Sequence, residues 1–121
     1  MNILKLSWVG TRTDTHDETA AFFHDVMGLT VKHSGKDFTV LALQDGATVE
    51  VFGPTSSFNR HLTHPVVGFL VADLERSLNE LHEAGVEIVL PIQRSNEGKW
   101  LHFRAPDGFV YELSEDEPIS E

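Results

Sequence analysis

The chain has 121 residues, of which 40% are hydrophobic and 23% are charged, the balance of one globular domain rather than of a disordered segment. Nineteen Asp and Glu against nine Lys and Arg give a formal net charge of −10, which repels phosphate backbones and anionic lipid. The absence of cysteine excludes disulfides, Cys-ligated zinc, iron–sulfur clusters and thiol catalysis. We therefore expect no nucleic acid or membrane partner, and, without a signal-type segment, a cytoplasmic protein.

The first half of the sequence predicts one strand, one helix and three further strands. Residues 4–13 alternate as a strand, after which Asp14 or Thr15 is placed to cap a helix with its side-chain oxygen. Apolar residues then recur at helical spacing as far as Gly28, which suits the left-handed position that ends a helix. The three strands that follow are expected over residues 30–33, 38–43 and 48–52.

The second half predicts the same elements in the same order. A strand over residues 66–71 leads into a helix over residues 74–84, with Asp73 as its cap and Gly85 at its end. The remaining strands are expected over residues 86–90, 100–104 and 109–114.

An internal repeat supports this duplication. The segments that begin at Asp45 and at Asp107 both read Asp-Gly, three residues, Glu and an aliphatic residue, and they occupy equivalent places in the two halves. The sequence therefore predicts an α+β fold of two tandem βαβββ modules. Its parts are a first module over residues 1–53, a linker over 54–64, a second module over 65–114 and an acidic tail over 115–121.

Alternation along the strands indicates which side chains share a face. Apolar residues such as Val49, Leu101 and Leu113 are expected to meet the helices, so their neighbours point to the opposite faces. Two such faces are expected to form the lining of a cleft. The candidate ligand-binding residues are Trp8, Glu50, Phe52, Trp100, His102 and Glu112. The alternatives are that the two glutamates are exposed at a sheet rim and that the tryptophans are core or interface anchors.

The seven histidines fall into two groups. Five are expected in loops or on helix surfaces without a functional role, namely His16, His24, His33, His61 and His82. His102 differs because it shares a strand face with Trp100, ten residues before Glu112. His64 lies two residues before Val66, so a register shift of two would bring its imidazole to the position of Val66 on the same face.

Several short segments resemble the vicinal oxygen chelate superfamily, the group of glyoxalase I, bleomycin resistance proteins, fosfomycin resistance enzymes and extradiol dioxygenases. The similarity covers nearly the whole chain, in both halves and in the same order. Its segments are Phe22-Phe23-His24-Asp25-Val26-Met27-Gly28-Leu29, Val71-Ala72-Asp73-Leu74, Ala84-Gly85-Val86, Phe103-Arg104-Ala105-Pro106-Asp107-Gly108 and Tyr111-Glu112-Leu113. The resemblance implies the glyoxalase/bleomycin resistance/dioxygenase fold, in which paired βαβββ modules form a cup-shaped mixed sheet, usually in a homodimer.

In metal-using members of this superfamily the cup holds a divalent ion such as Zn, Ni, Mn or Fe. One ligand comes from the first strand and one from the last strand of each module, commonly His and Glu. The equivalent positions here are Trp8 and Glu50 in the first module, and Val66 and Glu112 in the second. Both glutamates match the pattern, whereas an indole and a valine offer no lone pair to a metal. The resemblance therefore implies a protein that lacks the first-strand metal histidines.

Three classes of function follow, in order of preference. The first is a protein similar to bleomycin resistance proteins that binds a small molecule without metal or other cofactor, the ligand being cationic or aromatic. The second is a metal-dependent lyase, isomerase or dioxygenase of the same superfamily that uses Glu50 and Glu112 with His64 or His102. The third is a partner-binding domain, for which the sequence offers no positive feature. A homodimer is expected as well, because eight short strands in two open sheets leave edges and apolar faces that a second chain covers in the superfamily.

Overall fold

The computed structural model describes residues 1–116, which divide into two compact units. The N-terminal unit comprises Trp8–Val66, and the C-terminal unit comprises residues 1–7 and 67–116. The first strand, β1 (Ile3–Arg12), passes from one unit into the other, so its first residues pack with the second half of the chain. The linker predicted over residues 54–64 lies within the N-terminal unit.

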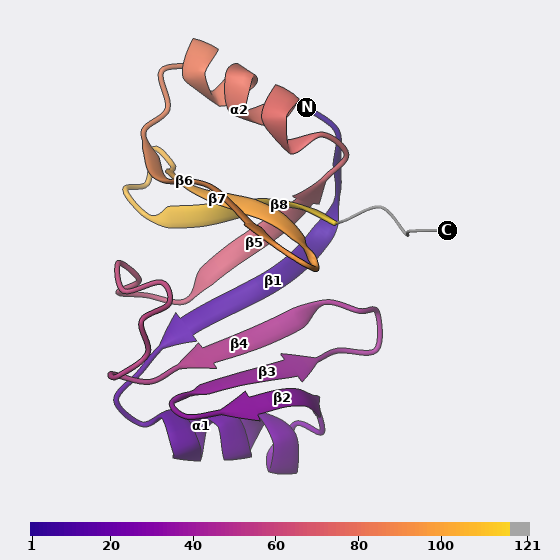
Figure 1. The fold of residues 1–121 in the computed structure, drawn as a ribbon, viewed down its shortest axis with the longest axis vertical. Coiled ribbons are helices and arrows are strands. Elements are labelled where there is room, and N and C mark those ends of the chain that lie inside the picture. The colour runs from indigo at the N-terminus through magenta and orange to yellow at the C-terminus, as the bar shows by residue number, and fades with distance from the viewer. Residues whose placement is uncertain (117–121) are drawn as a thin grey trace. The chain divides into compact units, whose positions relative to one another are not determined.

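The N-terminal unit consists of four strands with one helical segment on one face (Figure 1). The strand order is β2 (Thr30–Gly35), β3 (Phe38–Ala42), β4 (Thr48–Phe52) and β1, in which β1 and β4 run parallel and the other pairs antiparallel. The helical segment is a short α1 (His16–Ala21) that continues as a π-helical turn, η1 (Phe22–Val26). The core of the N-terminal unit consists of Leu41, Val49 and Val51, against which Val9, Phe23 and Leu29 pack.

The C-terminal unit has the same organisation. The strand order is β5 (Val66–Val71), β8 (Val110–Asp116), β7 (Gly98–Arg104) and β6 (Ile88–Ser95), in which β5 and β8 run parallel and the other pairs antiparallel. The helix α2 (Leu74–Glu83) packs on one face of these strands. The core of the C-terminal unit consists of Val71, Leu74, Leu81, Leu101 and Leu113. The predicted α+β fold of two βαβββ modules is therefore confirmed.

The predicted helix starts are confirmed in one unit and corrected in the other. The Asp73 side chain accepts a hydrogen bond from the Arg76 amide at 3.1 Å, as expected for the cap of α2. Thr15 occupies the N-cap position of α1, one of the two residues predicted for it, but the predicted side-chain bond to the helix backbone is absent. Its hydroxyl bonds instead to the hydroxyls of Thr13 and Thr19, at 3.0 and 3.1 Å.

The second-half strands extend further than predicted. β6 ends at Ser95 rather than at Leu90, because residues up to Ser95 pair with β7 as far as Gly98. β8 continues to Asp116 and thereby includes two residues assigned to the acidic tail. One of these, Glu115, accepts a hydrogen bond from the Leu74 amide at 2.8 Å. The other residues of that tail, 117–121, lie outside the described residues. Among residues 1–116, no helix is long and apolar enough to cross a membrane.

Candidate functional site

A buried histidine–glutamate pair lies on the face of the C-terminal strands that points away from α2. His102 on β7 and Glu112 on β8 are direct cross-strand partners, and His102 Nε2 lies 3.1 Å from Glu112 Oε1. The alternation of the strands explains their direction, because Leu101 and Leu113 point to the other face and join the core beneath α2. His102 is fully buried and Glu112 is 5% exposed.

Burial determines the charge of this pair. Loss of hydration lowers the pKa of His102 from 6.5 to about 4 and raises the pKa of Glu112 from 4.5 to about 8. Near neutral pH the imidazole is therefore uncharged, the carboxyl group keeps its proton, and the pair has no net charge. Such a pair can both donate and accept a hydrogen bond, and it lies where a charge would be costly to bury.

Trp100 and two serines lie next to the pair in the same unit. Trp100 precedes His102 by two residues on β7, points to the same face and is half-buried. Its cross-strand partner is Ser114, whose hydroxyl lies 3.4 Å from that of Ser7 on β1. The face thus presents an indole, an imidazole, a carboxyl group and two hydroxyls. Strand alternation identifies Ser114 from the sequence, whereas the approach of Ser7 depends on how β1 docks on this unit.

In the N-terminal unit, Trp8 and Glu50 also share one face. The register pairs Trp8 with Thr48 and Gly10 with Glu50, so the side chains of Trp8 and Glu50 point to the same side of β1 and β4. The indole of Trp8 lies over Gly10, at the place that a Cβ atom would occupy. Glu50 is half-buried and Trp8 is 8% exposed.

The register also relates the two glutamates to the internal repeat. Glu50 is the partner of Gly10, and Glu112 is the partner of Gly68, which occupies the equivalent place in the second half of the sequence. Each glutamate on the last strand of a module therefore faces a glycine on the first strand. The duplication is preserved at the candidate positions as well as in the order of the elements.

Substitution of Gly10 with Ala is expected to displace the indole of Trp8. The new methyl group would overlap the ring, so we expect a loss of about 1–2 kcal/mol in the free energy of unfolding and a red shift of tryptophan fluorescence. A matched control is Gly35→Ala, since the nearest atom to its new Cβ is Nε2 of the exposed His33 at 3.4 Å. Urea unfolding monitored by fluorescence checks both values. Equal effects of the two substitutions would contradict this placement of Trp8.

Phe52 belongs to an aromatic cluster in the N-terminal unit. It is 1% exposed and stacks on Phe38, with ring centroids 5.3 Å apart and an interplanar angle of 19°. Phe58 of the segment after β4 also contacts Phe38, at a centroid distance of 5.6 Å. The Arg12 guanidinium holds this segment through the carbonyl oxygens of Phe58, Ser56 and Pro54, at 3.0, 3.0 and 3.1 Å. Packing within this cluster accounts for the burial of Phe52.

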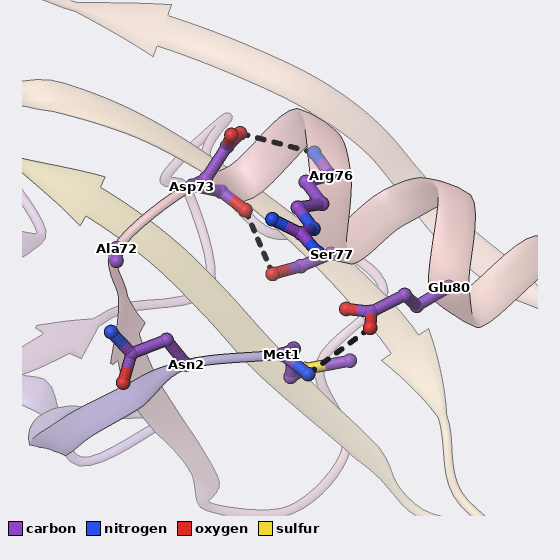
Figure 2. A pocket seen from close by; sticks show the side chains of 7 residues that line it. All are labelled: Met1, Asn2, Ala72, Asp73, Arg76, Ser77 and Glu80. Atoms are coloured by element: carbon purple, nitrogen blue, oxygen red, sulfur yellow. Dashed lines mark hydrogen bonds and ion pairs between the residues drawn. The ribbon is translucent and has the colours of Figure 1, made fainter.

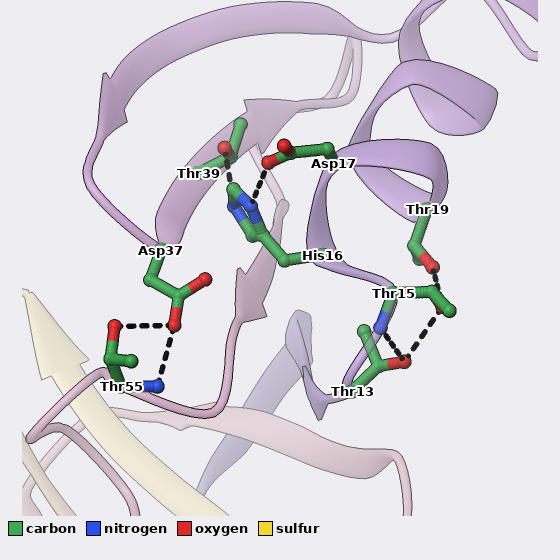
Figure 3. Close-up of polar contacts among 8 residues, drawn as sticks. All are labelled: Thr13, Thr15, His16, Asp17, Thr19, Asp37, Thr39 and Thr55. Atoms are coloured by element: carbon green, nitrogen blue, oxygen red, sulfur yellow. Dashed lines mark hydrogen bonds and ion pairs between the residues drawn. The ribbon is translucent and has the colours of Figure 1, made fainter.

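The expectation that His16 lies on the surface is wrong. Its ring is buried and bridges two polar groups, with Nε2 at 2.9 Å from Thr39 Oγ1 and Nδ1 at 2.8 Å from Asp17 Oδ1 (Figure 3). The docking of α1 on β3 brings Thr39 within reach, which local sequence does not reveal. Nearby, Asp37 accepts hydrogen bonds from the Thr55 hydroxyl and amide, and these lower the pKa of its carboxyl group.

The donor atoms of the described residues do not fit a tightly bound divalent ion. Residues 1–116 contain no group of three or more His, Asp or Glu arranged to hold a metal. Trp8 and Val66 provide no ligand atom at the first-strand positions, and the Nε2 of His102 is already bonded to Glu112. His64, which a register shift of two would have brought to the position of Val66 as a metal ligand, is exposed. Its Nδ1 lies 2.8 Å from Thr63 Oγ1.

Comparison with known proteins identifies the family. A sequence profile of the glyoxalase/bleomycin resistance protein/dioxygenase superfamily matches residues 5–113, nearly the whole chain. The chain belongs to this superfamily. The resemblance predicted from the two halves of the sequence is therefore confirmed. No curated protein matches this member of the superfamily significantly by sequence.

Solved structures with the same fold include enzymes and other members of the superfamily. Methylmalonyl-CoA epimerase from Mycobacterium tuberculosis is 21% identical, with a TM-score of 0.75 and coverage of 96% of this chain and 90% of that one. A superfamily member from Vibrio splendidus 12B01 is 22% identical, with a TM-score of 0.69 and coverage of 95% and 100%. Methylmalonyl-CoA epimerase from Streptomyces coelicolor, in complex with 2-nitronate-propionyl-CoA, is 16% identical, with a TM-score of 0.73 and coverage of 97% and 100%. At these identities the likeness establishes the fold.

Proposed function

We propose that this chain binds a small organic molecule without a metal ion, as bleomycin resistance proteins do. The observation that carries the proposal is the buried, uncharged His102–Glu112 pair beside the half-buried Trp100. An uncharged pair orients a ligand by hydrogen bonds, while an indole supplies a flat apolar surface for an aromatic or cationic group. Because the pair is almost fully buried, the half-buried Trp100 and Ser114 offer a ligand its first contact.

The overall charge favours a cationic or neutral aromatic ligand. The formal net charge of −10 attracts cations and repels the phosphate groups of a coenzyme A ester. In the N-terminal unit taken by itself, Trp8 and Glu50 share one face and would offer an indole and a carboxylate to a ligand of the same class. We therefore propose a ligand class different from the coenzyme A esters bound by the structurally similar epimerases.

Quenching of tryptophan fluorescence tests this proposal in chelator-treated protein. Metal-free bleomycin, a cationic ligand with aromatic rings, is expected to give saturable quenching, and methylmalonyl-CoA is expected to bind at least about tenfold more weakly. Trp100→Phe and His102→Phe are expected to weaken bleomycin binding, whereas the exposed control Phe109→Leu is expected to leave it unchanged. Tighter binding of methylmalonyl-CoA, or equal affinity in all variants, would overturn the proposal.

A second candidate is the enzyme alternative, an isomerase that transfers a proton through Glu112. It is favoured by the pKa of Glu112, which burial raises to about 8, within the range of an effective general base at neutral pH. Because the donor set does not fit a metal, this activity would rest on Glu112 with His102. Incubation of methylmalonyl-CoA in deuterated water distinguishes the candidates: an isomerase exchanges the α-hydrogen, and Glu112→Gln abolishes the exchange.

We also propose that two copies of the chain form a homodimer. Support comes from exposed apolar side chains, which are costly to leave in contact with water when they gather in patches. They occur near the start of the chain, at Ile3, Leu4 and Leu6, and along the helical segment of the N-terminal unit, at Phe22, Val26 and Met27. Light scattering coupled to gel filtration measures the mass, and a monomer at micromolar concentration would contradict the proposal.

A further inference from the structure

A cavity lies in the C-terminal unit, between α2 and the first residues of the chain (Figure 2). Its volume is about 310 Å³, and none of the residues of the proposed binding site lines it. This volume is at the lower end of the range for small-molecule sites, roughly 300–1,000 Å³. The polar side chains around it include Asn2, Asp73, Arg76 and Glu80.

One carboxylate oxygen and one guanidinium group on α2 lack a partner at this cavity among the described residues. Arg76 and Glu80 are four residues apart on the same helix, a spacing at which such side chains commonly pair. Here Glu80 Oε1 instead lies 3.1 Å from the Met1 ammonium. Glu80 Oε2 is buried and has no hydrogen-bond partner among the described residues. The Arg76 guanidinium likewise forms no ion pair or side-chain hydrogen bond within residues 1–116.

A buried carboxylate oxygen without a partner is unfavourable, and a donor that enters the cavity would relieve it. Figure 2 shows the second oxygen of Glu80 turned toward the space between the helix and the first residues of the chain. The Oδ1 atom of Asp73 is bonded to the Arg76 amide at 3.1 Å, and Glu80 Oε2 is the buried side-chain oxygen of the described residues that has no partner. The cavity thus offers one acceptor for a cationic group and one guanidinium for an anionic group.

We propose that this cavity binds a small zwitterion, a free α-amino acid with a short side chain. Its ammonium group would donate to Glu80 Oε2, and its carboxylate would accept from the Arg76 guanidinium. The two charged groups of an α-amino acid are separated by one carbon atom, which suits two side chains on adjacent turns of a helix face. The ligand would thereby bridge Arg76 and Glu80, which form no ion pair with each other among the described residues.

The test is an amide-resolved NMR titration of the full chain, prepared without an N-terminal extension because Met1 contacts Glu80. L-alanine is compared with propionate, which lacks the ammonium group, and with L-alaninamide, which lacks the carboxylate. L-alanine is expected to cause saturable shifts at Ala72 and Ser77 with a millimolar dissociation constant. Propionate and L-alaninamide are each expected to bind about tenfold or more weakly, since each loses one charged hydrogen-bonding group.

Two variants and a control connect the binding to the charged pair. Glu80→Gln and Arg76→Gln are each expected to weaken L-alanine binding about tenfold, whereas Glu83→Gln, on the same helix outside the cavity lining, leaves it unchanged. Unchanged amide signals elsewhere in the spectrum establish that the variants are folded. The proposal is overturned if L-alanine causes no saturable shift, if propionate binds equally well, or if the two variants bind like the wild type.

Discussion

Replacing Glu112 with Ala is expected to lower the free energy of unfolding by about 3 kcal/mol, whereas Glu112→Gln is expected to lower it by about 1 kcal/mol or less. The alanine leaves the fully buried ring of His102 without its partner at Nε2 and also leaves a void between β7 and β8. The glutamine has nearly the same volume, and its amide can still donate to the neutral ring. Urea unfolding monitored by circular dichroism gives both values.

The control for this experiment is Glu97→Ala, in the exposed turn between β6 and β7. Its effect is expected to stay within about 0.5 kcal/mol, the usual size for a surface substitution. A loss for Glu112→Ala no larger than for Glu97→Ala would show that the carboxyl group is solvated and that the pair is not buried in solution.

The free energy of unfolding of the wild type is expected to fall by about 2 kcal/mol between pH 6.5 and pH 8, a fall absent from Glu112→Gln. Burial raises the pKa of Glu112 from 4.5 to about 8, so in this range the folded chain holds a proton that the unfolded chain has lost. The stabilisation is complete below the unfolded pKa and disappears as the pH rises through the folded one.

His102 shifts stability in the opposite direction at lower pH. Burial lowers its pKa from 6.5 to about 4, so its contribution is complete above pH 6.5 and is lost as the pH falls through 4. Between pH 4.5 and 6.5 the slopes from the two groups cancel, and a plateau is expected. Urea titrations at intervals of half a pH unit, compared between the wild type and Glu112→Gln, isolate the contribution of the carboxyl group. Parallel profiles for the two proteins would contradict the raised pKa.

Sequence patterns predicted the faces of the strands more reliably than the contacts of the side chains. Alternation correctly separated His102 and Glu112 from Leu101 and Leu113, because apolar and polar residues alternate over residues 101–104 and 111–114. The bond between His102 and Glu112 depends in addition on the register of β7 with β8. That register is set by the turn between them, in which Gly108 has a φ of 86°, and the sequence indicates a turn without specifying its length.

Side-chain direction within a face was not predictable for Trp8. Alternation placed it on the same face as Glu50, but the indole lies along β1 over Gly10, which only a residue without a Cβ atom permits. His16 was missed for a related reason. Its position in the first turn of a short helix is typical of a solvated side chain, and its burial follows from contact with Thr39 on β3, which is distant in the sequence.

The central claim, that the site works without a metal ion, is tested most directly by calorimetry of chelator-treated protein with and without excess Zn, Ni or Mn. The proposed site offers a metal only the His102 imidazole and the Glu112 carboxyl group, which are bonded to each other. We therefore expect weak metal binding and a change in thermal midpoint of about 1 °C or less. A stoichiometric ion whose dissociation constant is a thousandfold below its concentration would instead raise the free energy of unfolding by about 4 kcal/mol. A stabilisation of that size, lost in Glu112→Gln, would contradict the account.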